Sequence, residues 1–336
     1  MTMRGRPAMP NKPTRAAQES TDAPKAPNPP EPPATEDSPE RRPPPLAGLF
    51  ELESAASDDQ IRSVVEQQIS QFIEETDALD DHNLLVLYDG RSIERSDANR
   101  IYRALSDVDR TRHTLLVLRS PGGDIAAAYF IGKLCREHTE TAFHVAIPRE
   151  AKSAATLICC GADEIHMGSL SELGPIDPQF GGMPALATKH SLEHLAEIAS
   201  RHSGAKEMLS DYLAKSLPVT VVGYFERAAG SAAQYAERLL SKRLSPMAES
   251  KNTEIANRLV YDYKDHGFAI DASEACTIFG HDMVKVNSSL YDVANQIYEQ
   301  LDLIEFIVGQ KFGRKLAFTG GIAGSCILYG HEDSGQ

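Results

Sequence analysis

Between residues 84 and 167 the sequence alternates short, mostly apolar runs with longer stretches of helical periodicity. The apolar runs lie at 84–88, 114–119, 142–148 and 164–167, and two of the helical stretches lie at 124–138 and 153–161. Runs that are apolar at successive positions, rather than at every second one, are typical of strands buried on both faces. Strand and helix in regular turn therefore predict an α/β fold, with a mainly parallel sheet covered by helices on both sides.

A serine lies at one of the predicted strand-to-helix junctions. Ser153 follows the apolar run that ends at Pro148, and it precedes a helix of small apolar residues at 154–161. The free N–H groups and the positive dipole end of the first helical turn suit a nucleophile whose product carries an oxyanion. The same position is also explained by a serine that does no more than cap its helix.

A pair of glycines ends the strand that precedes this one in the chain. Gly122 and Gly123 belong to the sequence SPGG, and without a Cβ atom they allow the backbone to turn its N–H groups outward. The stretch from Gly123 to Ser153 is long enough for one helix and one strand, so the two turns should be neighbours in a βαβ unit. We therefore expect an oxyanion hole at Gly122, Gly123 and Ala154, with Ser153 as the nucleophile.

Several segments together resemble a known family. SPGGDIAAAYFIGKL and AKSAATLICCGADEIHMGSLSELGPIDPQ lie within residues 84–182, and a weaker likeness runs to about residue 285. They resemble the Clp/crotonase superfamily, and within it the Clp-fold serine proteinases of the SDH (serine dehydrogenase proteinase) family, relatives of signal peptide peptidase A and Clp protease. The resemblance implies an α/β Clp/crotonase-like core with a helical arm and a small C-terminal lobe. It also implies a homo-oligomeric serine peptidase that acts on peptide or protein substrates. We expect no cofactor and no metal.

The residue that activates Ser153 is left open by the sequence. Clp proteases place a histidine about two dozen residues after the serine, in the logic of a triad, but here that position is nearest to Asp177, a weak base at neutral pH unless it is buried. Lys152 adjoins the serine, although a side chain next in sequence usually points elsewhere. Lys206, in HSGAKEML, resembles the segment that carries the lysine base of signal peptide peptidase A. His266, in DHGFAI, suits neutral pH and ranks after Lys206.

Two other functions remain compatible with the sequence. A crotonase-like enzyme would bind an acyl-CoA and stabilise an enolate in the same backbone hole, without a nucleophilic serine. A catalytically inactive scaffold would keep the fold and the oligomer but lack the base, which is suggested by the missing histidine. A serine opposite the SPGG turn favours the peptidase, because acyl transfer needs both features together.

Composition excludes some partners and compartments. The net charge of −14 and the absence of a large basic cluster argue against nucleic acid. The 5 cysteines lack the spacing of a zinc site, so we interpret them as reduced core residues. No apolar run reaches the ~18 residues of a membrane span, and no signal peptide is recognisable. We expect a soluble, cytoplasmic protein.

The sequence predicts the following division of the chain. A disordered, proline-rich tail occupies 1–45, followed by a helical segment at 46–83, the catalytic core at 84–190, a helical arm for oligomerisation at 191–245, a separate lobe at 246–310 and a tail at 311–336. An amphipathic stripe from Phe225 to Leu239 has no obvious partner in the core, which favours self-association. Asp124 is expected to cap the next helix, and His166 to lie on the surface of an edge strand.

Overall fold

The computed structural model describes residues 51–330, except residues 53, 56, 181–182, 203, 205 and 217–218. The side chains of residues 180, 183–190, 216, 219–222 and 225 are also outside the description. The predicted tail at 1–45 therefore lies outside the described residues, and so do residues 331–336. All described residues belong to one compact unit, Ser38–Gln336.

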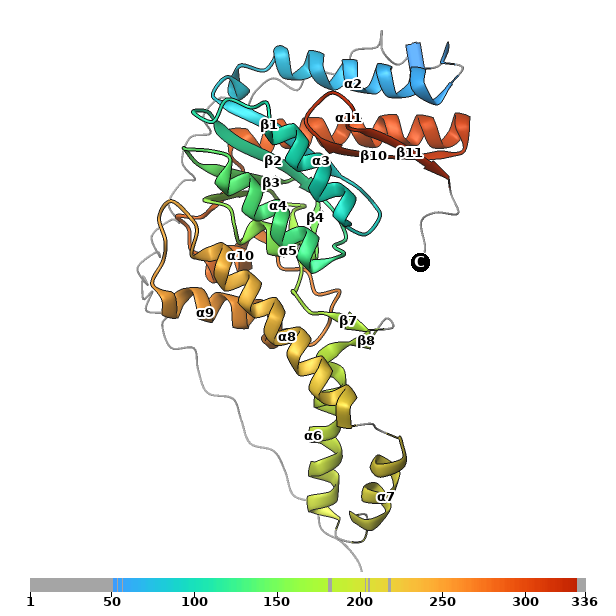
Figure 1. The fold of residues 1–336 in the computed structure, drawn as a ribbon, viewed down its shortest axis with the longest axis vertical. Coiled ribbons are helices and arrows are strands. Elements are labelled where there is room, and N and C mark those ends of the chain that lie inside the picture. Colours follow the sequence, from blue (N-terminus) through green and yellow to red (C-terminus); the bar gives the residue numbers. More distant parts are fainter. Residues whose placement is uncertain are drawn as a thin grey trace, which may run out of the picture. The chain divides into compact units, whose positions relative to one another are not determined.

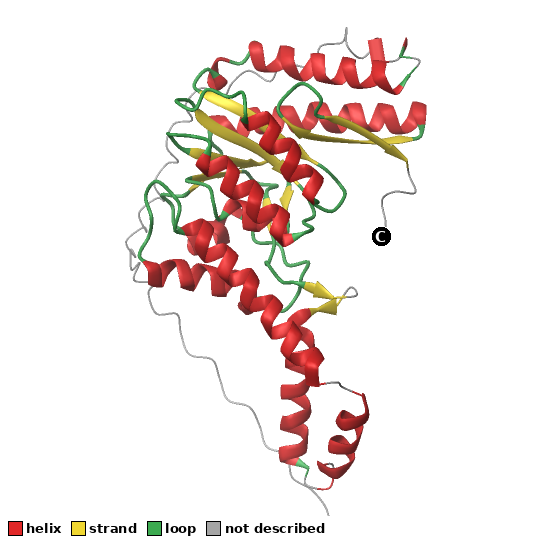
Figure 2. Cartoon of the chain, viewed as in Figure 1, coloured by secondary structure: helices red, strands yellow, loops and turns green. Residues whose placement is uncertain are grey.

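Helices and strands alternate through the first half of the described chain (Figure 2). The helices are α2 (Asp58–Glu74), η1 (Asp77–Leu79), α3 (Arg95–Leu105), α4 (Ile125–Glu137), α5 (Ala154–Cys159), α6 (Ala185–Arg201), α7 (Lys206–Ser216), α8 (Val219–Leu240), α9 (Glu249–Asn257), η3 (Arg258–Asp262), α10 (Ala272–Phe279) and α11 (Ser289–Phe312). The strands are β1 (His82–Tyr88), β2 (His113–Arg119), β3 (Phe143–Ile147), β4 (Glu150–Ala151), β5 (Glu164–Met167), β6 (Glu172–Leu173), β7 (Gln179–Phe180), β8 (Met183–Pro184), β9 (Val284–Val286), β10 (Arg314–Gly320) and β11 (Cys326–Gly330).

The main sheet of the described residues has 7 strands in the order β11-β10-β1-β2-β3-β5-β9. Strands β1, β2 and β3 of this sheet are labelled in Figure 1. Strands β1, β2, β3, β5 and β9 run parallel to their neighbours, whereas β10 and β11 are antiparallel. The predicted α/β fold with a mainly parallel sheet is thus confirmed. The carboxyl ends of the parallel strands lie at one edge, where the loops after β2 and β3 carry Gly122 and Ser153.

Each face of the sheet has its own apolar core. Leu116 and Leu118 of β2 face a cluster that includes buried residues of α3, α4, α5 and α8. Leu115 and Val117 face the other way, into a cluster with α2 and α11. Successive strand residues point to opposite faces, so a strand that is apolar at every position stabilises both layers at once.

Two predicted boundaries near the C-terminus are wrong. The segment at 311–336 was expected as a tail, but β10 pairs with β1, with Val86 opposite Gly320, and β11 completes the hairpin. The segment at 246–310 was expected as a separate lobe, but β9 extends the main sheet beside β5, and α11 packs in the second core. Both partners lie far away in the sequence, so local patterns give no sign of the pairing.

The helical arm is partly covered by its own chain. Ala232 and Leu239 of α8 are buried in the first core, and Leu239 lies beside Gly132 of α4. The C-terminal half of the amphipathic stripe therefore has an internal partner, contrary to the expectation that only another subunit would cover it. The side chain of Phe225 is outside the description. Tyr224, on the same helix, is exposed.

A buried ion pair joins the last turn of α4 to the loop before β5. Arg136 Nη1 lies 2.9 Å from Asp163 Oδ2, with both side chains about nine-tenths buried. The Asp163 carboxylate also accepts the N–H groups of Phe143 and Leu244, at 2.8 and 2.7 Å. The single carboxylate of Asp163 thus holds together the end of α4, the start of β3 and the segment after α8.

The predicted cap at Asp124 is confirmed, and Ser57 caps a second helix in the same way. The side chain of Ser57 accepts the N–H of Gln60 at 3.3 Å, and that of Asp124 accepts the N–H of Ala127 at 2.6 Å, so both act as N-caps. All five cysteines are buried and carry free thiols. Among the described residues, no helix combines the length and the apolar character needed to cross a membrane.

Candidate active site

Ser153 has a backbone conformation that residues with a side chain rarely adopt. Its φ is 51° and its ψ is −116°, immediately before α5. An ordinary N-cap lies in the extended region and its side chain accepts an N–H of the first turn. The Ser153 side chain accepts no hydrogen bond from the described N–H groups in the first turn of α5. Helix capping therefore does not explain this serine, and the strain of a positive φ points to a functional constraint.

The glycine turn makes room for the serine. A Cβ atom on Gly122 would lie 2.8 Å from both Ser153 Cβ and Lys152 O, and Gly122 has a φ of 107°. Gly123, with a φ of 148°, packs on Ile93 so closely that a Cβ atom would lie 2.2 Å from the Ile93 nitrogen. Both positions exclude any residue but glycine, and the two predicted turns are indeed neighbours.

The backbone N–H groups around Ser153 are not equivalent. The N–H of Gly122 donates to Ser120 Oγ at 3.2 Å, and the N–H of Asp124 donates to Ile93 O at 2.8 Å. Those of Gly123 and Ala154 have no hydrogen-bond acceptor among the described residues. Of the three N–H donors expected from the sequence, that of Gly122 is thus already hydrogen-bonded within the protein. Gly122 contributes to the site because its missing side chain leaves space for Ser153.

The hydroxyl group of Thr156 links the loop that carries Ser153 to the segment around Gly174. Its hydroxyl lies 2.7 Å from both Ala151 O and Gly174 O, and it accepts the N–H of Gly174 at 3.1 Å. The side chain is fully buried. The loop before α5 and the segment that leads to Asp177 are therefore held in a fixed relation by one hydroxyl group.

Ser153 lines a cavity of about 600 Å³. The cavity is bounded by the glycine turn, by the start of α5, by the segment 176–179, by α8 and by the loop that carries His266. On the α8 side the cavity is lined by Tyr224, Ala228 and Ser231. The volume falls within the range of small-ligand and substrate pockets in proteins.

His266, which lines this cavity, lies next to Asp177. His266 Nδ1 lies 3.9 Å from Asp177 Oδ2, the carboxylate is buried and the imidazole is partly exposed. Burial lowers the pKa of His266 below 6.5, and the nearby Lys152 charge lowers it further, whereas Asp265 raises it. The imidazole is therefore neutral at physiological pH, as a general base must be.

The pairing of these two residues follows from strand geometry. Leu173 and Ile270 form an antiparallel bridge. Asp177 comes four positions after Leu173, and His266 comes four positions before Ile270. Because the two segments are antiparallel at the bridge, these equal offsets bring Asp177 and His266 beside each other. Both residues were candidates from the sequence, but the bridge that brings them together leaves no local pattern.

The two lysines that were considered as bases lie in different surroundings. Lys152 Nζ is 3.0 Å from Glu172 Oε2 and within 3.4 Å of the carbonyl oxygens of Leu173 and Phe268. Its amine is thus held by three oxygen acceptors. Lys206 begins α7 and is exposed, and it is not among the described residues that line the cavity.

Comparison with known proteins gives two curated relatives, both uncharacterized proteins of Methanocaldococcus jannaschii. One is 37% identical over 98 residues, which is 29% of this chain and 34% of the relative. The other is 26% identical over 215 residues, which is 64% of this chain and 65% of the relative. The matched region thus spans about a third of one relative and just under two thirds of the other.

Among solved structures, two mutants of the 1510-N membrane-bound stomatin-specific protease are similar to this chain. The first matches with a TM-score of 0.38 and 14% identity, over 66% of this chain and 84% of that one. The second, in complex with a substrate peptide, has a TM-score of 0.37 and 14% identity, over 75% of this chain and 89% of that one. The family of ClpP-like SDH-type serine proteinases matches residues 51–316. The chain belongs to this family.

Proposed function

We propose that the protein hydrolyses peptide bonds with Ser153 as its nucleophile, activated by His266 and Asp177. The observation that carries the proposal is the strained backbone of Ser153, held against Gly122 in a cavity that His266 also lines. A strained serine at a strand-to-helix turn exposes its hydroxyl, and the neighbouring imidazole is of a type that can accept the proton.

In this mechanism the neutral imidazole of His266 takes the proton of the Ser153 hydroxyl as Oγ attacks the peptide carbonyl carbon. The proton then passes to the leaving amine, and an acyl-enzyme remains. Water, deprotonated by the same imidazole, attacks the acyl carbon and releases Ser153. Asp177, beside Nδ1, orients the ring and stabilises the imidazolium that forms.

The N–H groups of Gly123 and Ala154 are proposed as the oxyanion hole. They come from the two adjacent loops, and the other nearby donors at Gly122 and Asp124 already bond within the protein. A backbone hole of this kind stabilises the charge that develops on the carbonyl oxygen during attack.

We further propose that the substrate is a peptide or an unfolded segment of a protein, and that the enzyme works as a cytoplasmic homo-oligomer. Exposed apolar side chains on α7 and α8, such as Met208, Tyr212 and Tyr224, support contact with another subunit. Light scattering at micromolar concentration tests this part separately, since a monomer mass would contradict it.

The test of the mechanism combines a fluorophosphonate probe with hydrolysis of a fluorescent peptide library. We expect the probe to label Ser153 in the wild-type chain, and Ser153→Ala to lose labelling and hydrolysis while keeping its fold. His266→Ala should lower the hydrolysis rate by a factor of about 10³ or more, and Asp177→Asn should also lower it strongly.

Lys206→Ala is the matched control and should keep its activity. Loss of activity in Lys206→Ala together with full activity in His266→Ala would assign the base to the lysine. A folded wild-type chain that takes up no probe and cleaves no peptide would favour the inactive scaffold, and binding of acyl-CoA by such a chain would favour the crotonase-like enzyme.

A further inference from the structure

Four histidines lie side by side on four neighbouring parallel strands of the main sheet. His82, His113, His144 and His166 lie on β1, β2, β3 and β5. Neighbouring rings are 5.2 to 5.5 Å apart between centroids. They share the sheet face that is covered by α2 and α11, because they alternate along the strands with residues of the opposite core.

His166 departs from the sequence prediction. It was expected on the surface of an edge strand, but β5 lies between β3 and β9, and the imidazole is 4% exposed. The addition of β9 from far along the chain turns a predicted edge into an interior strand. An imidazole so deeply buried needs partners for both ring nitrogens.

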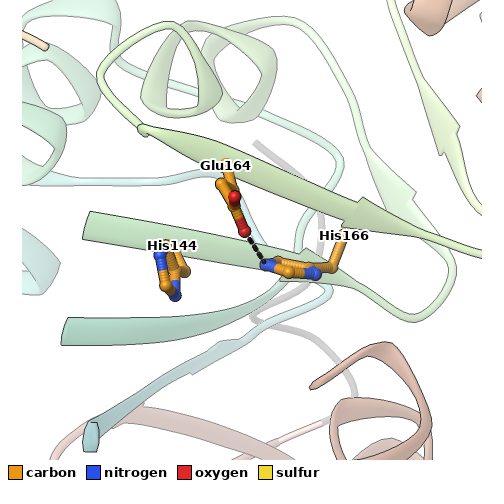
Figure 3. A group of neighbouring side chains, drawn as sticks. All are labelled: His144, Glu164 and His166. Carbon is orange, nitrogen blue, oxygen red and sulfur yellow. Dashed lines mark ion pairs between the residues drawn. The ribbon is translucent and has the colours of Figure 1, made fainter. Parts of the chain in front are cut away.

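Three side chains converge on one point beside His166 (Figure 3). His144, Glu164 and His166 each offer a ligand atom, and these atoms all lie within 4.8 Å of one another. His166 Nε2 and Glu164 Oε2 are 3.5 Å apart. That is close to the edge of a tetrahedron of ligands at Zn–N and Zn–O distances of about 2.0–2.2 Å. Strand register sets the arrangement, since His144 is directly opposite Glu164.

The two nitrogens of His166 differ in their surroundings. Nδ1 lies 2.7 Å from Ser288 Oγ, whereas buried Nε2 has no hydrogen-bond partner among the described residues. Ser288 Oγ already accepts the N–H of Tyr291 and has a second lone pair for Nδ1–H. With the proton on Nδ1, the lone pair of Nε2 faces the carboxylate of Glu164. A cation between them would satisfy both groups.

The remaining neighbours are compatible with such a cation. Lys285 Nζ lies 3.5 Å from Glu164 Oε1 and leaves Oε2 for the ligand site. His144 Nδ1 lies 3.3 Å from His82 Nε2, which orients the His144 ring.

We propose that His144, Glu164 and His166 form a binding site for a divalent transition-metal ion, with zinc as the fitting probe. Two imidazoles and one carboxylate form a ligand set that suits Zn²⁺. The bound ion would join β3 to β5 and, through Ser288, to the start of α11. The site is on the sheet face covered by α2 and α11, whereas α5, which follows Ser153, packs on the other face, so the proposal does not depend on the proposed peptidase mechanism.

The test measures metal bound to the full-length chain. The protein is stripped with a chelator, incubated with Zn²⁺ or Co²⁺, desalted and analysed for metal by atomic emission. We expect about one ion per chain, Co²⁺ absorption bands typical of a tetrahedral site, and a rise in melting temperature with Zn²⁺. Glu164→Gln should weaken Zn²⁺ binding by a factor of about 10 or more, as should His166→Asn.

His202→Ala is the matched control, because His202 is an exposed histidine at the end of α6, and it should bind zinc as the wild type does. Glu164→Gln decides the test if His166→Asn fails to fold, since the Glu164 side chain is partly exposed and borders solvent. A stripped wild-type chain that takes up neither ion overturns the proposal. So does unchanged binding by Glu164→Gln.

Discussion

A Cβ atom on Gly122 would lie 2.8 Å from the Cβ atom of Ser153. Real Cβ contacts at that distance are essentially absent, so the backbone of one turn and the side chain of the other fit only because position 122 is glycine. The contact links a loop after β2 to a loop after β3, and it holds the serine between a glycine turn and the first turn of α5.

Gly122→Ala should therefore abolish labelling of Ser153 by the fluorophosphonate probe. The added methyl group meets backbone and a Cβ atom rather than a flexible side-chain end, and φ is 107°, so we expect a loss of about 1–3 kcal/mol in the free energy of unfolding. Urea denaturation measures it. Gly204→Ala, where a Cβ atom would meet nothing within 4 Å, is the control, and equal labelling of the two variants would contradict the prediction.

Substitutions of Ser153 should separate strain from capping. Because φ is 51°, a residue with a side chain at this position carries about 1–3 kcal/mol of backbone strain energy. Glycine adopts this φ without a steric clash and would remove most of that strain. We expect Ser153→Gly to be more stable than Ser153→Ala by about 1 kcal/mol in thermal unfolding. Ser153→Ala should be about as stable as the wild type. If capping governed the site, both variants would lose stability, with the alanine losing about 0.5–2 kcal/mol.

The rate of hydrolysis should rise with pH through a midpoint below 6.5. Burial and the charge of Lys152 lower the pKa of His266, and only the neutral ring can act as the base, so activity is lost as the ring is protonated at lower pH. Lys152→Gln removes the lysine charge, which raises this pKa and moves the midpoint to higher pH.

Asp265→Asn should move the same midpoint in the opposite direction, since Asp265 raises the pKa of His266. The two variants form a matched pair in a profile of kcat/KM against pH. Shifts of both variants in one direction, or no shift in either, would show that the titrating group is not His266.

Asp163→Ala should destabilise the fold by about 3–5 kcal/mol, because it leaves the buried Arg136 charge without its counter-ion and two N–H groups without their acceptor. Chemical denaturation measures the change. Glu254→Ala breaks the exposed pair with Lys251 and should cost less than about 1 kcal/mol. A similar loss in both variants would mean that the Asp163 network contributes no more than a surface pair.

The parts of the fold that local patterns determine were predictable. Strands β1, β2 and β3 are mostly apolar runs separated by helices, so their parallel direction follows from the sequence. Strands β9 and β10 pair with β5 and β1 across long stretches of chain, and their short runs carry no sign of a partner. The predicted lobe and tail were wrong for this reason.

The candidate active site shows the same contrast between residues placed by local sequence patterns and residues placed by long-range pairing. Ser153, Gly123 and Ala154 lie on turns whose residues and spacing are local. Asp177 and His266 belong to segments joined by the bridge of Leu173 and Ile270, which no local pattern reveals. The metal-ligand cluster left one trace, the alternation of Glu164 and His166 on one face of a strand, but His144 joins them only through the register of β3 and β5.

The position of β10 beside β1 has a consequence for the biosynthesis of the chain. A ribosome delivers β1 early, while the strand that pairs with its outer edge, residues 314–320, emerges only after all the elements from α3 to α11. Until then β1 presents unpaired N–H and C=O groups, which are a template for strands of other nascent chains. Synthesis that stops before residue 314 therefore yields a product that is prone to aggregate, even though every residue of the serine loop and its cavity has already been made.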